Sequence, residues 1–186
     1  MSKKIFIING SGGVGKDSFV KLFADNYGRD LVWNYSSVDK VKRIAKEIGW
    51  KGKKTEKDRK FLSDLKLLTT EYNNMPFNDL TKKIKAFKNS EAQVLFLHIR
   101  EPEEISKIIE YCLTLDTLSI HTILVQRKGT IQITSNMADR NVFNYMYDIT
   151  IHNDGELEDL NNIAKRFVKD VKLDSWFSHA IYDSKE

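Results

Sequence analysis

Residues 10–17, GSGGVGKD, have the spacing in this chain that is best suited to chemistry. Gly10, Gly15 and Lys16 fit the pattern G-x-x-x-x-G-K, in which a glycine-rich turn directs successive backbone N–H groups toward phosphate oxygens. The lysine would contact the β- and γ-phosphates as a point charge. The pattern therefore predicts a site for ATP or GTP made of Gly10, Ser11, Gly12, Gly13, Val14, Gly15, Lys16, Asp17 and Ser18.

The residues around this stretch favour a phosphate loop over a glycine-rich surface turn with an exposed lysine. Residues 3–9 form a continuous apolar run, typical of a strand buried on both faces. An amphipathic helix is expected directly after the loop, and its N-terminus would add a positive dipole at the phosphates. A strand before the motif and a helix after it are the context that the motif requires.

Asp17 stands where this pattern usually has the serine or threonine that ligates Mg²⁺, and Ser18 follows it. A carboxylate is a hard oxygen ligand that could bind Mg²⁺ directly or through water. A negative charge beside a triphosphate would be unfavourable without a cation. We therefore predict that Asp17 is a metal ligand in an Mg²⁺-dependent site, the alternative being an aspartate that only caps the helix.

Strands and helices are expected to alternate along the chain, which predicts right-handed crossovers and a parallel sheet covered on both sides. The expected fold is a three-layer α/β/α domain spanning residues 1–186, with a five-stranded parallel sheet. Its strands are predicted at 3–9, 31–36, 92–99, 120–126 and 147–152. Ligands of such sheets bind outside the carboxyl ends of the strands. The polar residues at these ends are Asn9, Ser36, Ser37, His98, Arg100, Arg127, Asn153 and Asp154.

Composition narrows the class of protein without selecting a ligand. A chain of 186 residues with 41% hydrophobic and 30% charged residues suits one globular domain, and its net charge of +4 fits a small anion as well as nucleic acid. The single Cys112 excludes an internal disulfide and is expected to be a small buried hydrophobe. No apolar run is long enough to span a membrane, so a cytoplasmic location with no membrane partner is expected.

Arginines could supply the charge neutralisation that phosphoryl transfer requires. Arg100 and Arg127 each follow a predicted strand, and Arg140 lies in the polar stretch 128–146, which could close as a lid and exclude water. Together with Lys16 these three arginines are the candidate catalytic residues. Each could instead be a solvated surface charge.

Residues that could hold a phosphate acceptor follow the second predicted strand. Ser36, Asp39 and Lys42 lie at the start of a predicted helix, and Arg59 lies in the basic stretch 51–60. Arg59 could clamp an acceptor phosphate, and Asp39 could act as general base if the acceptor is an alcohol. Nucleic acid is disfavoured for the basic stretch, because no aromatic residues interleave with its charges.

With GKD in place of GKS or GKT, the chain resembles a subset of the phosphate-loop nucleoside monophosphate kinase superfamily. The phage-type deoxynucleoside monophosphate kinases and the animal-type phosphomevalonate kinases are similar. Four further stretches resemble theirs in the same order: SSVDKVKRIAKE (36–47), KDRKFLSDLK (57–66), VLFLHIREPEE (94–104) and YDITIHNDG (147–155).

This resemblance implies a helical acceptor-binding region over 37–90, a lid over 128–146, and a turn containing Asn153 and Gly155 beside the adenine. His98 departs from it, because the family usually has an acidic residue at that strand end. A histidine there is a poor Mg²⁺ ligand, and it could either hydrogen-bond locally or have a functional role.

The sequence thus predicts ATP-dependent phosphoryl transfer to a small phosphate-bearing acceptor, with a (deoxy)nucleoside monophosphate favoured and with ATP and Mg²⁺ as cofactors. One alternative is a kinase of a non-nucleotide small molecule. Another is a nucleotide-binding regulatory module without kinase activity. A GTPase-type switch is disfavoured, because the sequence has no N-K-x-D motif. The sequence is also compatible with a homodimer.

Overall fold

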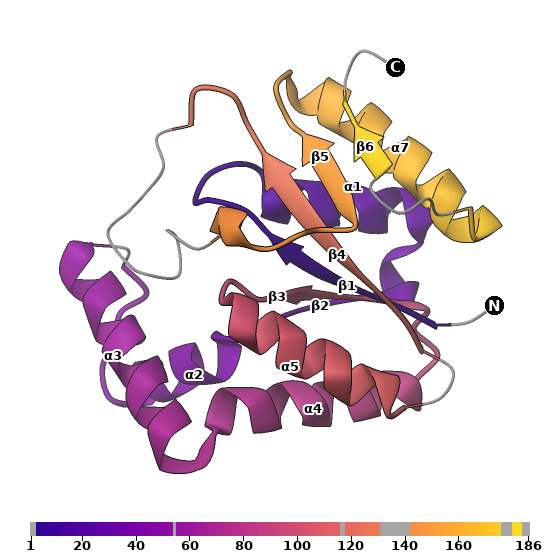
Figure 1. Ribbon diagram of the computed structural model, residues 1–186. Helices are drawn as coiled ribbons and strands as arrows, with labels where there is room; N and C mark the ends of the chain where they lie inside the picture. The colour runs from indigo at the N-terminus through magenta and orange to yellow at the C-terminus, as the bar shows by residue number, and fades with distance from the viewer. Residues whose placement is uncertain (1–2, 54, 116–117, 131–141, 176–179, 184–186) are drawn as a thin grey trace. The chain divides into compact units, whose positions relative to one another are not determined.

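The computed structural model describes residues 3–53, 55–115, 118–130, 142–175 and 180–183 (Figure 1). The chain divides into two compact units. The first, the sheet unit, is Met1–Asn34 with Glu91–Glu186, and the second, the helical unit, is Tyr35–Ser90. The bounds of the helical unit are close to those expected for the acceptor-binding region, residues 37–90.

The protein has an α/β fold with a single all-parallel sheet of six strands in the order β2-β3-β1-β4-β5-β6, flanked by helices. The strands are β1 (Lys3–Asn9), β2 (Val32–Ser36), β3 (Val94–His98), β4 (Leu118–Gln126), β5 (Ile149–His152) and β6 (Ala180–Tyr182). The parallel sheet is therefore confirmed, whereas the predicted number of five strands is wrong. The additional strand β6 has only three residues, too few to show a periodic pattern in the sequence.

The helices follow the predicted alternation with the strands. Those of the sheet unit are α1 (Lys16–Tyr27), the short η1 (Arg29–Leu31), α5 (Pro102–Leu113), the short η2 (Val142–Asn144) and α7 (Leu157–Leu173). Those of the helical unit are α2 (Asp39–Glu47), α3 (Glu56–Asn73) and α4 (Met75–Lys88). No helix in the described part of the chain is both long and apolar enough to cross a membrane.

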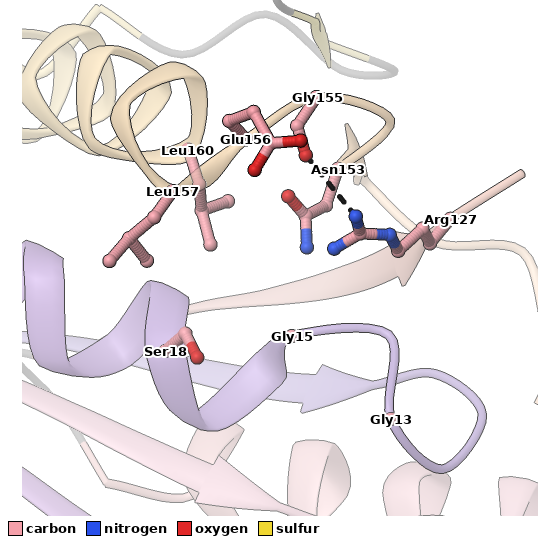
Figure 2. Close-up of a pocket in the computed structure, with 9 residues that line it drawn as sticks. All are labelled: Gly13, Gly15, Ser18, Arg127, Asn153, Gly155, Glu156, Leu157 and Leu160. Carbon is pink, nitrogen blue, oxygen red and sulfur yellow. Dashed lines mark hydrogen bonds between the residues drawn. The ribbon is translucent and has the colours of Figure 1, made fainter.

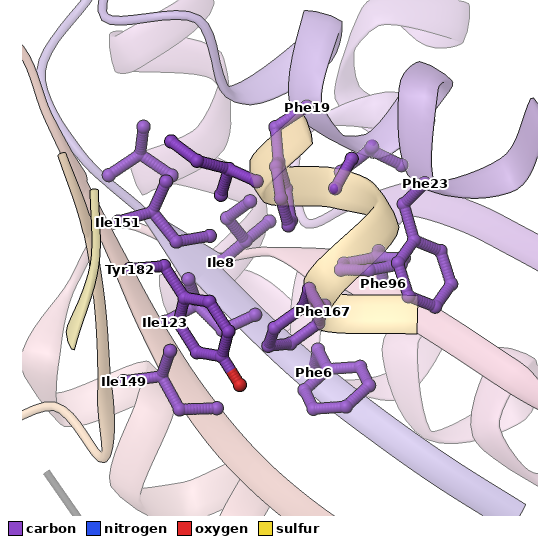
Figure 3. Close-up of a cluster of buried hydrophobic side chains, with 14 of the residues drawn as sticks. Phe6, Ile8, Phe19, Phe23, Phe96, Ile123, Ile149, Ile151, Phe167 and Tyr182 are labelled. Atoms are coloured by element: carbon purple, nitrogen blue, oxygen red, sulfur yellow. The ribbon is translucent and has the colours of Figure 1, made fainter. Parts of the chain in front are cut away.

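The sheet unit has a core dominated by aromatic rings between the sheet and helices α1 and α7 (Figure 3). Phe6 of β1 stacks on Phe96 of β3 with ring centroids 5.4 Å apart, and Phe167 of α7 packs against Phe6 at 5.2 Å. The alternate β1 residues Ile5 and Ile7 are also fully buried. Strand β1 is thus buried on both faces, as its continuous apolar run predicted. This packing fixes the carboxyl end of β1, where the glycine-rich loop begins.

The helical unit contains the packed helices α2, α3 and α4. Helix α3 begins with a capping box in which Thr55 accepts from the backbone of Asp58 and the Asp58 carboxylate accepts from the backbone of Thr55. Helix α4 begins with Pro76 near its N-terminus, where the missing N–H has no cost. Asn74, between the two helices, has a left-handed φ of +56°, and together with Pro76 it explains why α3 and α4 are separate helices rather than one.

Candidate nucleotide site

A glycine-rich loop connects β1 to α1 and requires glycine for its backbone conformation. Gly10, Gly13 and Gly15 have φ angles of +143°, +83° and +98°, which residues with a side chain rarely adopt. A Cβ on Gly10 would also lie 2.3 Å from the carbonyl oxygen of Val125. The loop therefore packs directly against the backbone of β4 and curls back on itself before α1 starts.

The N-terminus of α1 opens onto this loop. Gly15 is the N-cap and provides no side-chain acceptor, and the first helical hydrogen bond runs from Phe19 N to Gly15 O at 2.9 Å. The backbone N–H groups of the first turn thus have no acceptor within the helix. Together with the helix dipole, such N–H groups form a binding site for an anion.

The Lys16 side chain folds back over the loop. Its Nζ atom donates to Gly10 O at 2.6 Å and to Ser11 O at 2.7 Å. An ammonium group has three donors, and the two carbonyl oxygens orient it at the mouth of the loop. The role of Lys16 as a point charge beside bound phosphates stays a prediction.

Asn9 anchors the beginning of the loop and is fully buried. Its Oδ1 atom accepts from Gly10 N at 2.8 Å, and its Nδ2 atom donates to Arg100 O at 3.0 Å and to the Tyr147 hydroxyl at 2.8 Å. The Tyr147 hydroxyl in turn donates to Val142 O at 2.8 Å. One side chain therefore connects the loop to the segment after β3 and to the segment that leads into β5.

Asn153 anchors the end of the loop from the carboxyl end of β5. Its Nδ2 atom donates to Val14 O at 2.9 Å, and its backbone N–H donates to Gln126 O at 2.8 Å. A Cβ on Gly15 would lie 2.3 Å from this Nδ2 atom, so only glycine leaves room for the contact. The sequence predicted Asn153 beside a nucleotide, and the structure gives it a direct contact with the loop.

A cavity of about 280 Å³ lies beside the loop and the first turns of α1 and α7 (Figure 2). Figure 2 shows the Arg127 guanidinium on one side of it, where one nitrogen donates to Gly155 O at 3.3 Å. Its lining residues are Gly13, Gly15, Ser18, Arg127, Asn153, Gly155, Glu156, Leu157 and Leu160. This volume lies close to the lower end of the range for small-molecule sites.

The wall of the cavity is fixed by a contact between the ends of β4 and β5. The Asp154 carboxylate accepts from Lys128 N at 2.7 Å and lies 3.4 Å from the Lys128 ammonium. The hydrogen bond from the Lys128 backbone lowers the pKa of Asp154, which keeps the carboxylate ionised. The predicted residues Arg127, Asn153 and Gly155 are thus brought together at one end of the sheet.

The other predicted catalytic arginines are placed differently. Arg100 follows β3, and its backbone carbonyl is held by Asn9. Arg140 lies outside the described residues, as does most of the predicted lid 128–146. The Asn9–Tyr147 contact was not predicted, because nothing in the local sequence indicates that residues 138 positions apart meet.

Asp17 and His98 lie next to each other beside the loop. Asp17 Oδ1 is 3.8 Å from His98 Nδ1, and the His98 Nε2 atom is 2.8 Å from Asn34 Oδ1. Among the described residues, no group of three or more His, Cys, Asp or Glu side chains gathers at a metal site. Mg²⁺ in phosphoryl-transfer sites is usually held by one or two carboxylates together with substrate phosphates and water, so Asp17 fits that requirement.

The predicted acceptor residues belong to the helical unit. The Asp39 carboxylate accepts from Ser36 N at 2.8 Å and lies 3.8 Å from the Lys42 ammonium. These contacts give the Asp39 carboxylate a structural role at the start of α2, which it has whether or not it also acts as a general base. Arg59 is exposed in the first turn of α3.

The sequence did not predict that a group of charged side chains in the helical unit would gather around Tyr35. The Tyr35 hydroxyl donates to the Asp79 carboxylate and accepts from Arg43 at 3.0 Å, while Lys83 lies over the Tyr35 ring at 5.0 Å. Lys40 lies 4.0 Å from the same carboxylate. Burial and the contact with Asp79 raise the pKa of Tyr35, so its hydroxyl stays protonated. Two cations, Lys40 and Arg43, therefore lie within 4.0 Å of the Asp79 carboxylate, and a third, Lys83, contacts the Tyr35 ring.

No protein-family model matches the chain, and a search of curated proteins finds no match. The fold and the geometry described above are therefore the basis for any functional assignment.

Proposed function

We propose that this protein is an ATP-dependent kinase that transfers a phosphoryl group to a small phosphate-bearing acceptor. A (deoxy)nucleoside monophosphate is the favoured acceptor. The observation that carries the proposal is the loop at Gly10–Gly15, with glycines at positive φ, an open helix N-terminus and the Lys16 ammonium held over it. Such a loop presents several donors to phosphate oxygens at once.

The cavity beside the loop supports a nucleotide rather than a bare phosphate. A triphosphate bound at the N-terminus of α1 would leave its nucleoside next to Arg127, Asn153 and the apolar side chain of Leu160. A flat base can pack between an arginine and apolar side chains. We therefore also propose that the fold is that of a phosphate-loop kinase, in which the ends of β1, β4 and β5 hold ATP.

The charge of the helical unit supports an anionic acceptor. Residues 35–90 contain fifteen Lys and Arg against seven Asp and Glu, a net charge of +8, whereas the remaining 130 residues have a net charge of −4. The overall charge of +4 hides this asymmetry. A positive field of this kind attracts a phosphate-bearing substrate and repels a cationic one.

In the proposed mechanism the protein positions phosphates and neutralises their charge. The loop N–H groups and Lys16 would bind the transferred phosphate, and Arg100 is the proposed donor to the charge that develops during transfer, whereas Arg127 would lie beside the nucleoside. Mg²⁺, when bound, would neutralise charge on the β- and γ-phosphates, and Asp17 is its proposed ligand. A phosphate acceptor is already anionic, so no general base is required.

The test is ADP production from ATP and Mg²⁺ with a panel of nucleotide and metabolite acceptors. We expect slow hydrolysis of ATP alone and faster turnover with one class of acceptor. Lys16→Ala should weaken ATP binding by about 1.5–3 kcal/mol, which is roughly 10- to 150-fold. Lys21→Ala, an exposed lysine of the same helix, is the matched control and should bind ATP like the parent.

Two arginine variants separate the parts of the mechanism. Arg59→Ala should raise the apparent acceptor constant and leave ATP affinity unchanged, and Arg100→Ala should lower turnover. If no acceptor stimulates turnover and both variants behave like the parent, the kinase proposal is wrong. A nucleotide-binding regulatory module would then replace it, whereas stimulation by a non-nucleotide metabolite would identify a different kinase.

A further inference from the structure

The segment that follows β4 begins with a hydrogen-bonded turn. Thr130 N donates to Arg127 O at 3.3 Å, and Gly129, the third residue of the turn, has a φ angle of +71°. A positive φ at that position is typical of a type II turn and favours glycine. Because the turn begins at Arg127, it determines where the Arg127 side chain leaves the backbone.

The residues on both sides of Arg127 are held to the end of β5. The Asp154 carboxylate accepts from Lys128 N at 2.7 Å, and the Gln126 carbonyl accepts from Asn153 N at 2.8 Å. The backbone of Arg127 is therefore fixed between two hydrogen bonds. One of the two comes from a side chain, that of Asp154, and can be removed by mutation.

The two sides of the cavity differ in their chemistry. On one side is the planar Arg127 guanidinium, which is oriented by its hydrogen bond to Gly155 O at 3.3 Å. Figure 2 shows Leu157 and Leu160 on the other side. Leu160 is only 2% exposed, whereas Leu157 is 64% exposed. A ligand in the cavity can therefore cover the apolar surface of Leu157.

Two polar side chains of the cavity wall have contacts of their own within the protein. The Asn153 Nδ2 atom donates to Val14 O at 2.9 Å, and the Glu156 carboxylate accepts from the backbone of Asp159 in the capping box of α7. These contacts restrain both side chains against turning toward the edge of a base. The described lining thus favours contact with the faces of a base.

We propose that the nucleotide site accepts purine and pyrimidine nucleoside triphosphates alike, because it holds the base by its faces between Arg127 and Leu157. Asp154 is then the positioning residue for Arg127. The inference rests on the proposed function and extends the phosphoryl donor from ATP to this class of nucleotides. Every base has a face on which it can stack, so contacts of this kind tolerate any base. A site that hydrogen-bonds the edge of a base would instead reject the others strongly.

The experiment compares the four bases with no base. Calorimetry measures the affinity of the parent for non-hydrolysable analogues of ATP, GTP, CTP and UTP and for inorganic tripolyphosphate, each with Mg²⁺. We expect the four nucleotides to bind within about tenfold of one another, with the purines tighter because their faces are larger. Each nucleotide should bind at least about tenfold more tightly than tripolyphosphate.

A leucine variant tests where the base lies. Leu157→Ala should weaken the binding of all four nucleotides by a similar factor, about fivefold, because it removes apolar surface that the base covers. It should leave tripolyphosphate binding unchanged. Leu173→Ala is the matched control, because Leu173 ends the same helix and is also 64% exposed. This control should bind all five ligands like the parent.

Three variants test the positioning role of Asp154. Asp154→Ala should weaken nucleotide binding by about fivefold and leave tripolyphosphate binding unchanged. Asp154→Asn keeps an oxygen that can accept from Lys128 N, so it should bind like the parent. Lys128→Ala should also do so, because it removes only an ammonium group that is 84% exposed and keeps the backbone N–H. Equal weakening of nucleotides and tripolyphosphate in Asp154→Ala would show that Asp154 supports the phosphate loop rather than Arg127.

Other results would overturn the inference as a whole. A preference of more than about a hundredfold for one base would show that its edge is read by hydrogen bonds. An unchanged nucleotide affinity in Leu157→Ala would place the base elsewhere. Tripolyphosphate binding as tight as nucleotide binding would show that the base makes no contact, although the phosphate loop binds as proposed. Failure of all five ligands to bind the parent would instead overturn the proposed function, and the inference with it.

Discussion

The loop depends on a tyrosine that lies far away in the sequence, and removing its hydroxyl should have a measurable cost. In Tyr147→Phe the ring remains and two buried hydrogen bonds are lost. One is the bond that the hydroxyl accepts from Asn9, and the other is the bond that it donates to Val142 O, both at 2.8 Å. Tyr147 is only 7% exposed, so water cannot easily replace either partner.

The magnitude follows from the groups left without a partner. One N–H of Asn9 and the carbonyl of Val142 lose their partners, and a buried unsatisfied group costs about 1–3 kcal/mol. We therefore expect Tyr147→Phe to lower the free energy of unfolding by about 2–4 kcal/mol. With a urea dependence of about 2 kcal/mol/M, the unfolding midpoint should fall by roughly 1–2 M.

Tyr182→Phe provides a matched control away from the loop. Tyr182 is 8% exposed, and its hydroxyl donates to the half-buried Asp170 carboxylate at 2.6 Å. Water can reach that carboxylate, so this variant should lose only about 1 kcal/mol. It should bind a non-hydrolysable ATP analogue like the parent. Tyr147→Phe should bind that analogue more weakly, because Asn9, which accepts from the first glycine of the loop, loses one of its own partners.

Urea unfolding followed by circular dichroism, together with calorimetry of the ATP analogue, tests this reasoning. A midpoint for Tyr147→Phe equal to that of the parent would show that the hydroxyl does not anchor the loop. Equal losses in the two tyrosine variants, with equal nucleotide affinity, would refute the specific connection to the loop and leave only a general packing effect.

Three further predictions concern individual residues. Gly15→Ala should abolish nucleotide binding in calorimetry, because the positive φ and the 2.3 Å approach to Asn153 leave no room for a Cβ. Cys112 is buried, and burial raises its pKa to about 12, so a thiol reagent at pH 8 should label it only after denaturation. Burial lowers the pKa of His121, so the unfolded state binds the extra proton first and stability should fall as the pH drops below about 6.5. In His121→Gln this part of the pH dependence of urea unfolding should disappear.

The sequence predicted those features that depend on neighbouring residues. The apolar run 3–9, the glycines of the loop and the start of α1 are local, and each occurs where the pattern placed it. Strand β6 shows the limit of such patterns. It is held by contacts of Tyr182 with Phe167, whose ring centroid is 5.3 Å away, and by pairing with β5, and three residues contain no period that reveals this.

Contacts between residues that lie far apart in the chain could not be predicted from the sequence. The role of Asn9 depends on which strands lie beside β1, and the cluster around Tyr35 depends on how α2 and α4 pack. The number of cations in the helical unit was visible in the sequence. The charge difference between the two units was not visible, because the net charge of +4 is a sum over both units and the sequence does not show where they divide.

The strand order explains why these residues meet at one place. Strand β1 lies between β3 and β4, so the loop after β1 lies between the ends of β3, which leads to Arg100, and β4, which leads to Arg127. In Figure 1, α1, which follows β1, and α5, which follows β3, lie on opposite faces of the sheet. Adjacent parallel strands whose following helices diverge leave a crevice at their carboxyl ends, and ligands of such sheets bind there. The motif and the topology are independent observations, and both direct the search for a ligand to the N-terminus of α1, where Lys16, Asp17 and His98 lie.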